Sequence, residues 1–287
     1  MNVKTIGVLV VLGAALMWAL EPILAKLAYV SADFMQTQLI RVAIIALLAA
    51  LYGIATKGKF KPTKKQIKAI VYVAVAGTLV ADLIYFFALA SIPSVNAVLL
   101  GHLQPVFIIL MGFFILKEDK LNKFDYLGVL FMVLAGLFVT TRTVENLISF
   151  KIGTLGDLLV LFATVVWATT TIAMRKYLRE MNAGVITFYR FFIATLAFGA
   201  YLVFTQGIVF PNIFQLMLGA VGAFGTILYY EGLKRIKAAQ VSALELAAPF
   251  FAAILGFFVL EEVVFPMQII GLLLLVAGVY FLSKKEA

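Results

Sequence analysis

Ionisable side chains interrupt the long apolar segments of this sequence, and they are the first candidates for chemistry. His102, the only histidine of the chain, is one of them. A charged group in the middle of a membrane costs about 2.5–3.5 kcal/mol, so several unpaired charges would exceed the usual ~5–15 kcal/mol of folding stability. We therefore expect these groups to pair, to reach the membrane surface, to become neutral or to face water. The other ionisable residues in apolar segments are Glu21, Lys26, Arg41, Asp82, Arg190, Glu231 and Glu245. Lys26 and Glu231 lie near segment ends and are expected to reach the membrane surface.

Acidic and basic groups fall at depths that allow ion pairs between helices. Glu21 and Asp82 lie about as deep as Arg41 from the same membrane face. This predicts a structural ion-pair cluster or, alternatively, a cluster in which one acid is left to titrate. Arg190 and Glu245 lie at similar depth from the opposite face, so a pair between them is geometrically possible. If Glu245 instead faces a cavity, burial favours its protonated form, and it can carry a proton from one side to the other.

Polar residues and prolines near mid-segment are candidates for binding a small molecule. His102 changes charge near neutral pH, although a lone histidine in a helix is also typical of hydrogen-bonded packing. Gln104 lies about 200° further round an ideal helix, so we expect the two side chains to point to different faces. Pro105 and Pro249 each remove a backbone hydrogen bond and free a carbonyl four residues earlier, which predicts either a ligand-binding site or a plain kink.

Aromatic residues complete the candidate site. Trp18 and Trp167 lie near the middle of their segments, where they can stack on a flat or apolar substrate or interact with an amine. Tyr85 and Tyr229 are nearer the ends, where an interfacial belt is the alternative reading. The predicted substrate-binding residues are Trp18, Glu21, Tyr85, His102, Gln104, Trp167, Tyr229 and Glu245, and the predicted coupling or ion-pair residues are Glu21, Arg41, Asp82, Arg190 and Glu245.

Several other chemistries find no support in the sequence. The chain has no cysteine, so disulfides, thiolate metal sites and thiol catalysis are excluded. It contains no zinc-protease, serine-hydrolase or phosphate-loop motif, and we expect no catalytic residue, no metal site and no cofactor. The net charge of +9 comes from loop lysines and arginines that act as topology signals, so we expect no nucleic-acid partner.

The elements that must position these residues are membrane-spanning helices. Hydrophobic residues make up 64% of the 287 positions and charged residues 13%, which is too few to cover a soluble protein of this size. A span needs about 20 apolar residues, and breakers at glycine and proline divide the chain into ten such segments. We predict an all-α integral membrane protein with helices at 5–29, 34–56, 67–90, 94–116, 122–141, 153–178, 183–205, 212–234, 238–260 and 264–283.

The ten segments form two copies of one unit, at residues 1–146 and 147–287. Matching residues are 149 positions apart early in the unit and 144 apart later, which predicts a five-residue deletion in the eighth helix. Because each unit has an odd number of helices, the second must be inverted, and such repeats place a substrate site at the bilayer midplane. The matched pairs include Trp18 with Trp167, Arg41 with Arg190, Tyr85 with Tyr229, and Pro105 with Pro249.

Loop charges support the inversion and set the topology. The loop at 57–66 holds five lysines, whereas its counterpart at 206–215 holds none. Nearly all loop lysines and arginines fall on the side of both termini, and the other side has only Arg142 and Lys151. The positive-inside rule then predicts a multi-pass protein of the cell membrane with both termini in the cytoplasm.

These motifs resemble a known family. In the first half, the resemblance rests on WALEPILAK at 18–26 with Arg41, YFFAL at 85–89 with Pro105, and Lys117-Glu118. In the second half, it rests on their partners, which are Trp167, Arg190, Tyr229-Tyr230, Pro249 and Glu261-Glu262. The chain resembles the drug/metabolite transporter superfamily in its EamA-like branch. The resemblance implies a central cavity lined by the first four helices of each half, with the fifth and tenth at the periphery. It also implies transport of a metabolite, most often outward.

The sequence thus predicts a secondary transporter that moves a small metabolite, either an amino acid or an amphipathic compound, by alternating access. Export, with possible proton coupling, is the main hypothesis, and an uncoupled uniporter or exchanger is the alternative. A lipid scramblase or a membrane-embedded enzyme is a more distant one. The expected partners are the small-molecule substrate and the lipid bilayer, with the chain as a monomer or homodimer.

Overall fold

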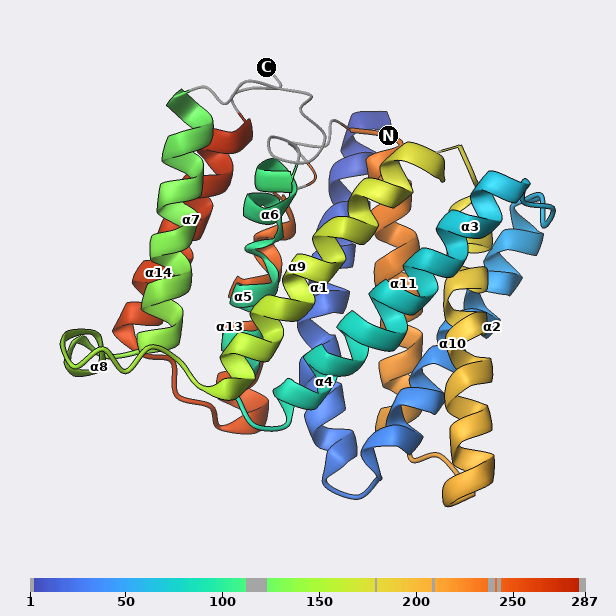
Figure 1. Cartoon of the computed structure of the whole chain (residues 1–287), viewed down its shortest axis with the longest axis horizontal. Helices are drawn as coiled ribbons and strands as arrows, with labels where there is room; N and C mark the ends of the chain where they lie inside the picture. Colours follow the sequence, from blue (N-terminus) through green and yellow to red (C-terminus); the bar gives the residue numbers. More distant parts are fainter. Residues whose placement is uncertain are drawn as a thin grey trace.

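The computed structural model describes residues 3–111, 123–178, 180–207, 210–236, 241 and 244–283. All regular elements in these ranges are helices (Figure 1). The first half contains α1 (Val3–Tyr29), α2 (Phe34–Ala55), α3 (Lys64–Tyr72), the π-helix η1 (Val73–Asp82), α4 (Leu83–Leu89), α5 (Ser94–Gly101), α6 (Gln104–Met111) and α7 (Lys123–Thr141). The second half contains α8 (Val144–Ile148), α9 (Leu155–Tyr177), α10 (Ala183–Thr205), α11 (Ile213–Leu233), α13 (Ala247–Leu260) and α14 (Pro266–Ser283).

The predicted ten-helix membrane fold is confirmed. Within the described residues, eight helical stretches are long and apolar enough to cross a membrane, and two shorter apolar helices, at 247–260 and 266–282, supply the remaining two. α3, η1 and α4 follow one another without a break and act as a single span, and α5 and α6 act as another. The predicted end of the fourth span, at 112–116, and the start of the ninth, before residue 241, lie outside or at the edge of the described residues.

Local sequence explains where these helices begin. Thr63 accepts a hydrogen bond from the amide of Gln66, whose side chain accepts one from the Thr63 amide, forming a capping box at the start of α3. Asn212 and Gln215 form the same box at the start of α11, the equivalent helix of the second half. The span from Lys64 to Leu89 has 26 residues and α11 has 21. The predicted five-residue deletion therefore corresponds to a real difference in helix length.

The two halves run in opposite directions and are interleaved. In Figure 1, α1 descends from the end where the chain begins, whereas its counterpart α9 ascends towards that end. α1 packs against α11 and α13 of the other half, and α9 packs against η1, α4, α5 and α6 in the equivalent way. α2 packs against its own counterpart α10. Each half thus forms part of the wall of the other, and the predicted boundary after residue 146 falls within α8.

The fifth and tenth spans form a separate pair at one edge of the bundle. α7 and α14 pack against each other, as seen on the left of Figure 1. A Cβ atom added to Gly278 would lie 3.0 Å from the carbonyl oxygen of Gly128, so this close approach requires small residues. The family resemblance implied a peripheral position for this pair, and the pair does lie at one edge, although Val279 of α14 reaches the central cavity.

The charged loops separate by end. The loop containing Lys57, Lys59 and Lys61 lies at the end where α1 begins and α14 finishes, and the segment with Arg142 and Lys151 lies at the opposite end (Figure 1). We call the first the basic end. We call the second the sealed end, because a hydrogen-bonded group around Lys26 and Glu262 closes the bundle there.

Candidate functional site

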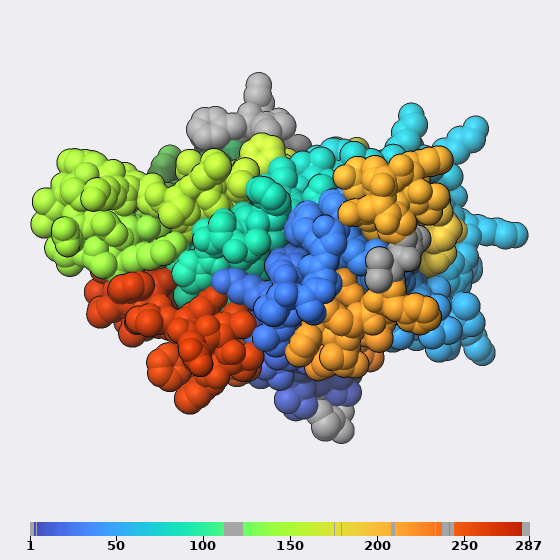
Figure 2. All heavy atoms as spheres, turned by 90° about the horizontal axis from the view of Figure 1, so that it is seen from below, coloured from blue at the N-terminus to red at the C-terminus, as the bar shows by residue number. Residues whose placement is uncertain are grey.

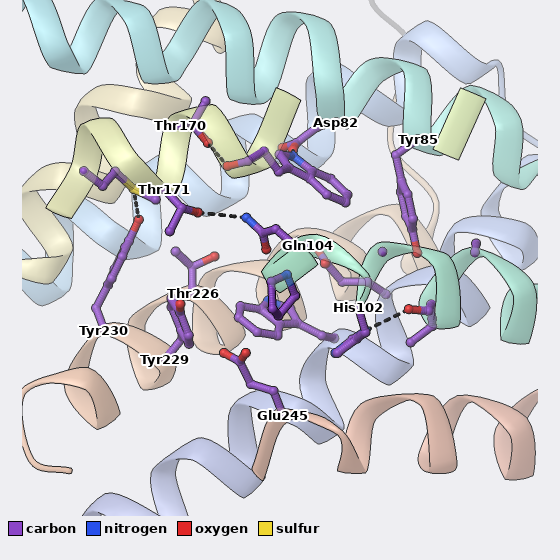
Figure 3. Close-up of a pocket in the computed structure, with 18 of the residues that line it drawn as sticks. Asp82, Tyr85, His102, Gln104, Thr170, Thr171, Thr226, Tyr229, Tyr230 and Glu245 are labelled. Carbon is purple, nitrogen blue, oxygen red and sulfur yellow. Dashed lines mark hydrogen bonds between the residues drawn. The ribbon is translucent and has the colours of Figure 1, made fainter. Parts of the chain in front are cut away.

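A cavity of about 230 Å³ lies in the middle of the bundle, between the two halves. All of the predicted substrate-binding and ion-pair residues line it, so the structure brings together side chains from positions 18 to 245 of the chain. Figure 3 shows the labelled members pointing towards a common centre from several helices. Their function remains a prediction, but their common location supports the midplane site expected of inverted repeats.

Four charged residues form an ion-pair cluster on one wall. Arg41 lies 3.3 Å from Glu21 and 3.4 Å from Asp82, measured between guanidinium nitrogen and carboxylate oxygen. Arg190 reaches the same carboxylate of Asp82 at 3.2 Å. The cluster around Arg41 agrees with the sequence analysis, which did not foresee that Arg190 joins it. Because α2 and α10 pack against each other, the two equivalent arginines meet at one acid.

Neighbouring groups hold this cluster in place. Asp82 ends the π-helix η1, and its carboxylate also accepts a hydrogen bond from the indole nitrogen of Trp167 at 2.8 Å. The Nε of Arg190 donates to the buried hydroxyl of Thr78 at 2.8 Å. The Arg41 guanidinium lies 4.2 Å from the ring centre of Phe86. Asp82 therefore joins α2, α9 and α10, and it occupies an unusual π-helical segment of the kind often found at functional sites.

Both helices that carry a central proline are interrupted there. α5 ends at Gly101, two residues form a turn, and α6 begins at Gln104. α13 begins at Ala247, just before Pro249. The imidazole Nδ1 of His102 lies 2.7 Å from the Val98 carbonyl oxygen, and the ring also contacts the backbone of Glu245, whose carbonyl Pro249 cannot satisfy. The prolines therefore accompany helix breaks rather than plain kinks.

The helix break corrects one expectation. His102 and Gln104 were predicted to point to different faces, but both line the cavity. The prediction assumed a continuous α-helix, and the turn between Gly101 and Gln104 changes the relation between the two side chains. Gln104 donates its side-chain amide to the hydroxyl of Thr171 at 2.8 Å, which links the fourth span to α9 of the other half.

Aromatic contacts repeat the symmetry of the two halves. The rings of Trp18 and Tyr229 are 5.0 Å apart and tilted by 50°. The equivalent rings of Trp167 and Tyr85 are 5.1 Å apart and tilted by 48°. Each tryptophan therefore packs against a tyrosine from the other half in a tilted arrangement, and all four rings line the cavity rather than an interfacial belt. A Cβ atom on Gly225 would lie 3.0 Å from Trp18, so this glycine gives the indole its space.

Glu245 occupies the wall opposite Asp82. Figure 3 shows its carboxylate directed into the pocket, on the side that also carries Tyr229, while Asp82 lies across the pocket. Both walls thus present acids, but only the Asp82 wall has the two arginines among its members.

The sequence analysis missed several neutral residues of the site. Thr170, Thr171 and Met174 line the cavity on α9, and Thr226 and Tyr230 line it on α11. The Tyr230 hydroxyl lies 2.8 Å from the sulfur of Met174. Trp167, Thr170, Thr171 and Met174 follow the i, i+3, i+4, i+7 spacing of one helical face, and this periodicity was the available signal.

A hydrogen-bonded group closes the bundle on one side of the cavity. The Lys26 ammonium lies 2.6 Å from the Glu262 carboxylate and 2.6 Å from the Ile92 carbonyl oxygen. Glu262 also accepts from the backbone amide of Ser94 at 2.8 Å. Lys26 was expected to reach the membrane surface, and its ammonium contacts groups in the links between helices at this end of the bundle. Glu231, in contrast, pairs with Lys234 and Arg235 at a helix end.

This group defines the sealed end. It connects α1, the turn before α5 and the link between α13 and α14, and Leu89 and Ile92 are buried beside it. Figure 2 views this end directly, and the segments near residues 30, 90 and 260 meet over the middle of the face. The cavity residues Ile108, Met174 and Tyr230 lie further along their helices, towards the basic end.

Comparisons with known proteins agree with this architecture. The model of the EamA-like transporter family matches residues 5–141 and, a second time, residues 154–284. An Archaeoglobus fulgidus protein named as an uncharacterized transporter is 26% identical over 282 residues, covering 94% of this chain and 95% of the relative. The uncharacterized transporter YyaM of Bacillus subtilis is 25% identical over 252 residues, covering 83% and 81%.

Other relatives are matched over a smaller part of their length. An uncharacterized transporter of Synechocystis sp. is 27% identical over 233 residues, which cover 76% of this chain but 66% of the relative. For a relative from Methanothermobacter thermautotrophicus the covered share of the relative is 62%. A solved crystal structure superposes with a TM-score of 0.69 over 97% of both chains at 18% identity, a likeness of fold alone. Because the family model covers nearly the whole chain, this multi-pass membrane protein belongs to the EamA-like transporter family.

Proposed function

We propose that the protein is a secondary transporter that moves a small metabolite, an amino acid or an amphipathic compound, by alternating access. The observation that carries the proposal is the central cavity between two inverted, interleaved halves, closed at one end by the group around Lys26 and Glu262. In alternating access, the two halves rock against each other, so that the cavity opens first to one side of the membrane and then to the other. The family, and relatives named as transporters, support this type of function.

The proposed orientation places the basic end in the cytoplasm of a cell-membrane protein. The lysines of the loop at 57–61 lie at this end, and positive residues favour the cytoplasmic side. The sealed end then faces outward, so that in this conformation the group around Lys26 and Glu262 separates the cavity from the outside. Such a state suits an exporter, which must load inside and release outside.

The proposed driving force is a proton gradient acting through Glu245. Its carboxylate points into the cavity, where it can be reached from whichever side is open. Uptake of a proton on one side and its release on the other would couple substrate movement to the proton gradient. The rival mechanism is uncoupled exchange, in which transport follows the substrate gradient alone.

Transport in proteoliposomes tests the proposal. Vesicles are loaded with candidate amino acids and amphipathic compounds, and counterflow of the labelled compound is measured with and without an imposed pH difference. We expect saturable counterflow for at least one compound and accumulation that follows the pH gradient. In Glu245→Gln, the gradient-driven accumulation should fall at least tenfold, while Glu231→Gln, outside the cavity, should resemble the wild type. Equal accumulation in Glu245→Gln and the wild type would exclude coupling through this residue.

A further inference from the structure

We propose that the wall formed by Glu245, Trp18 and Tyr229 binds a protonated amine, so that the substrate is an amphipathic amine without a free carboxylate. The inference rests on the transport function proposed above and narrows its substrate class. It excludes amino acids, which that function still allows.

The opposite wall already satisfies its positive charges. Arg41 directs Nε and one terminal nitrogen to Glu21 and the other terminal nitrogen to Asp82. Arg190 directs Nε to Thr78 and a terminal nitrogen to Asp82. A substrate carboxylate could bind these arginines only by competing with two buried acids, whose loss from the pairs would leave charges without compensation. The wall therefore offers poor recognition of the carboxylate of an amino acid.

The Glu245 wall has the chemistry that recognises a cation. Its carboxylate is directed into the pocket, and a charge-assisted hydrogen bond to an ammonium group is about twice as strong as a neutral one. Trp18 and Tyr229 line the same cavity, and their ring centres are 5.0 Å apart. The interaction of a cation with an aromatic face contributes about 0.5–2 kcal/mol. Among the described lining residues, the acids Glu21, Asp82 and Glu245 outnumber the arginines Arg41 and Arg190.

The space between the two walls suits an uncharged body. Gln104 and Thr171 are hydrogen-bonded to each other, and Thr226 adds a hydroxyl group. Tyr85 and Trp167 supply a second aromatic pair, with tilted rings, on the far side of the cavity. A molecule with an amine at Glu245 and an apolar or aromatic body across the cavity would contact both pairs. The geometry thus favours compounds that carry charge at one end and a ring at the other.

The protein contains its own probe for this test. It has two tryptophans, and both line the cavity, so binding there changes the intrinsic fluorescence. Purified protein is titrated at neutral pH with phenethylamine, phenylalanine and phenylpropionate, which share a phenyl ring and differ in net charge. We expect saturable binding of phenethylamine with an affinity at least tenfold higher than that of the other two compounds. Trp18→Phe should remove the larger part of the signal change, because the amine binds beside Trp18, and Trp167→Phe should remove the smaller part.

Variants of the acids provide the matched comparison. Glu245→Gln should weaken phenethylamine binding at least tenfold and leave phenylalanine binding unchanged. Glu231→Gln removes an acid that pairs with Lys234 and Arg235 outside the cavity, and it should bind phenethylamine as the wild type does. If Glu245→Gln does not fold, the comparison of the three compounds on the wild-type protein still decides the question.

Two results would overturn the inference: phenylalanine binding as tightly as phenethylamine, or phenethylamine binding unaffected in a folded Glu245→Gln variant. Counterflow assays separate this failure from failure of the transport function. Counterflow of an amino acid without binding of the amine would leave the transporter standing and reject the amine. Binding of the amine without counterflow of any compound would leave the amine site standing and reject the transporter.

Discussion

The two walls of the cavity hold their acids in different ways. Asp82 accepts bonds from Arg41, Arg190 and Trp167, which come from three different helices. Glu245 stands at the start of a broken helix, next to His102, with its carboxylate directed into the pocket. The carboxylate of Asp82, with three donors around it, is part of the scaffold, whereas the carboxylate of Glu245 lies on the wall of the cavity where a ligand can contact it. Within one cavity, Asp82 therefore has a structural role, and Glu245 is the candidate for binding a ligand.

The repeat sharpens this contrast. The tryptophan–tyrosine pairs, which are the same in both halves, have nearly equal geometry on both sides of the cavity, and the equivalent arginines Arg41 and Arg190 meet at Asp82. Residues that differ between the halves carry the asymmetric chemistry, since Glu245 takes the place of a glycine, and Thr226 takes the place of Asp82 at the same offset of 144. We therefore expect the loss of the Asp82 carboxylate, which both arginines contact, to affect mainly stability, and the loss of the Glu245 carboxylate to affect mainly recognition.

The largest effect is expected for Asp82→Asn. Both arginines of the cluster would lose their shared carboxylate, and a broken buried ion pair costs about 3–5 kcal/mol. Thermal unfolding in detergent should therefore show a large loss of stability. Glu245→Gln, on the other wall, should melt close to the wild type. Wild-type melting of Asp82→Asn with lost transport would contradict the comparison, because the cluster would then be a working site and not a frame.

A second large effect is expected at the sealed end. Glu262→Gln removes the charge that binds Lys26 and weakens the bond from Ser94, and hydrogen bonds to charged groups contribute about 1.5–3 kcal/mol. A shift of 1.4 kcal/mol changes an equilibrium about tenfold. Because the chain has no cysteine, Val98→Cys places a single thiol in the cavity. Its labelling by an impermeant maleimide from the sealed side should rise about tenfold in Glu262→Gln.

The neighbouring acid is the control for this measurement. Glu261 is exposed and lies one residue before Glu262, so Glu261→Gln should label at the wild-type rate. Equal labelling in all three proteins would show that the group around Lys26 does not hold this end closed.

A smaller difference is expected between the two tryptophans. Their tilted contacts with tyrosine are equivalent, but the Trp167 indole also donates to Asp82 at 2.8 Å. Trp167→Phe should therefore destabilise the protein by about 1 kcal/mol more than Trp18→Phe. Thermal unfolding of both variants checks this order. The reverse order would mean that the tryptophan–tyrosine pairs, and not the Asp82 cluster, dominate the stability of the cavity.

Much of the fold followed from the sequence, and the reason is physical. Apolar length and breakers determine spans, and the odd repeat determines the inversion, so the ten helices and the charge cluster around Arg41 could be predicted. The rest depends on which helix faces meet. Arg190 binds Asp82 because α10 packs near η1, and Lys26 pairs with Glu262 because the link between α13 and α14 comes within its reach. The common face of His102 and Gln104 depends on a helix break whose position proline suggested but whose geometry the sequence left open.

The smallest effect is expected at Thr226, the counterpart of Asp82. Thr226→Val keeps the shape of the side chain and removes one hydroxyl group from the cavity, so the free energy of unfolding should change by only about 0.5 kcal/mol. The change in phenethylamine affinity should likewise be small, because the amine binds at the Glu245 wall. Thermal unfolding and fluorescence titration measure the two quantities. A large loss of stability would mean that the two halves contribute equally to the frame at this level, and the asymmetry between Asp82 and Thr226 would then be one of residue type only.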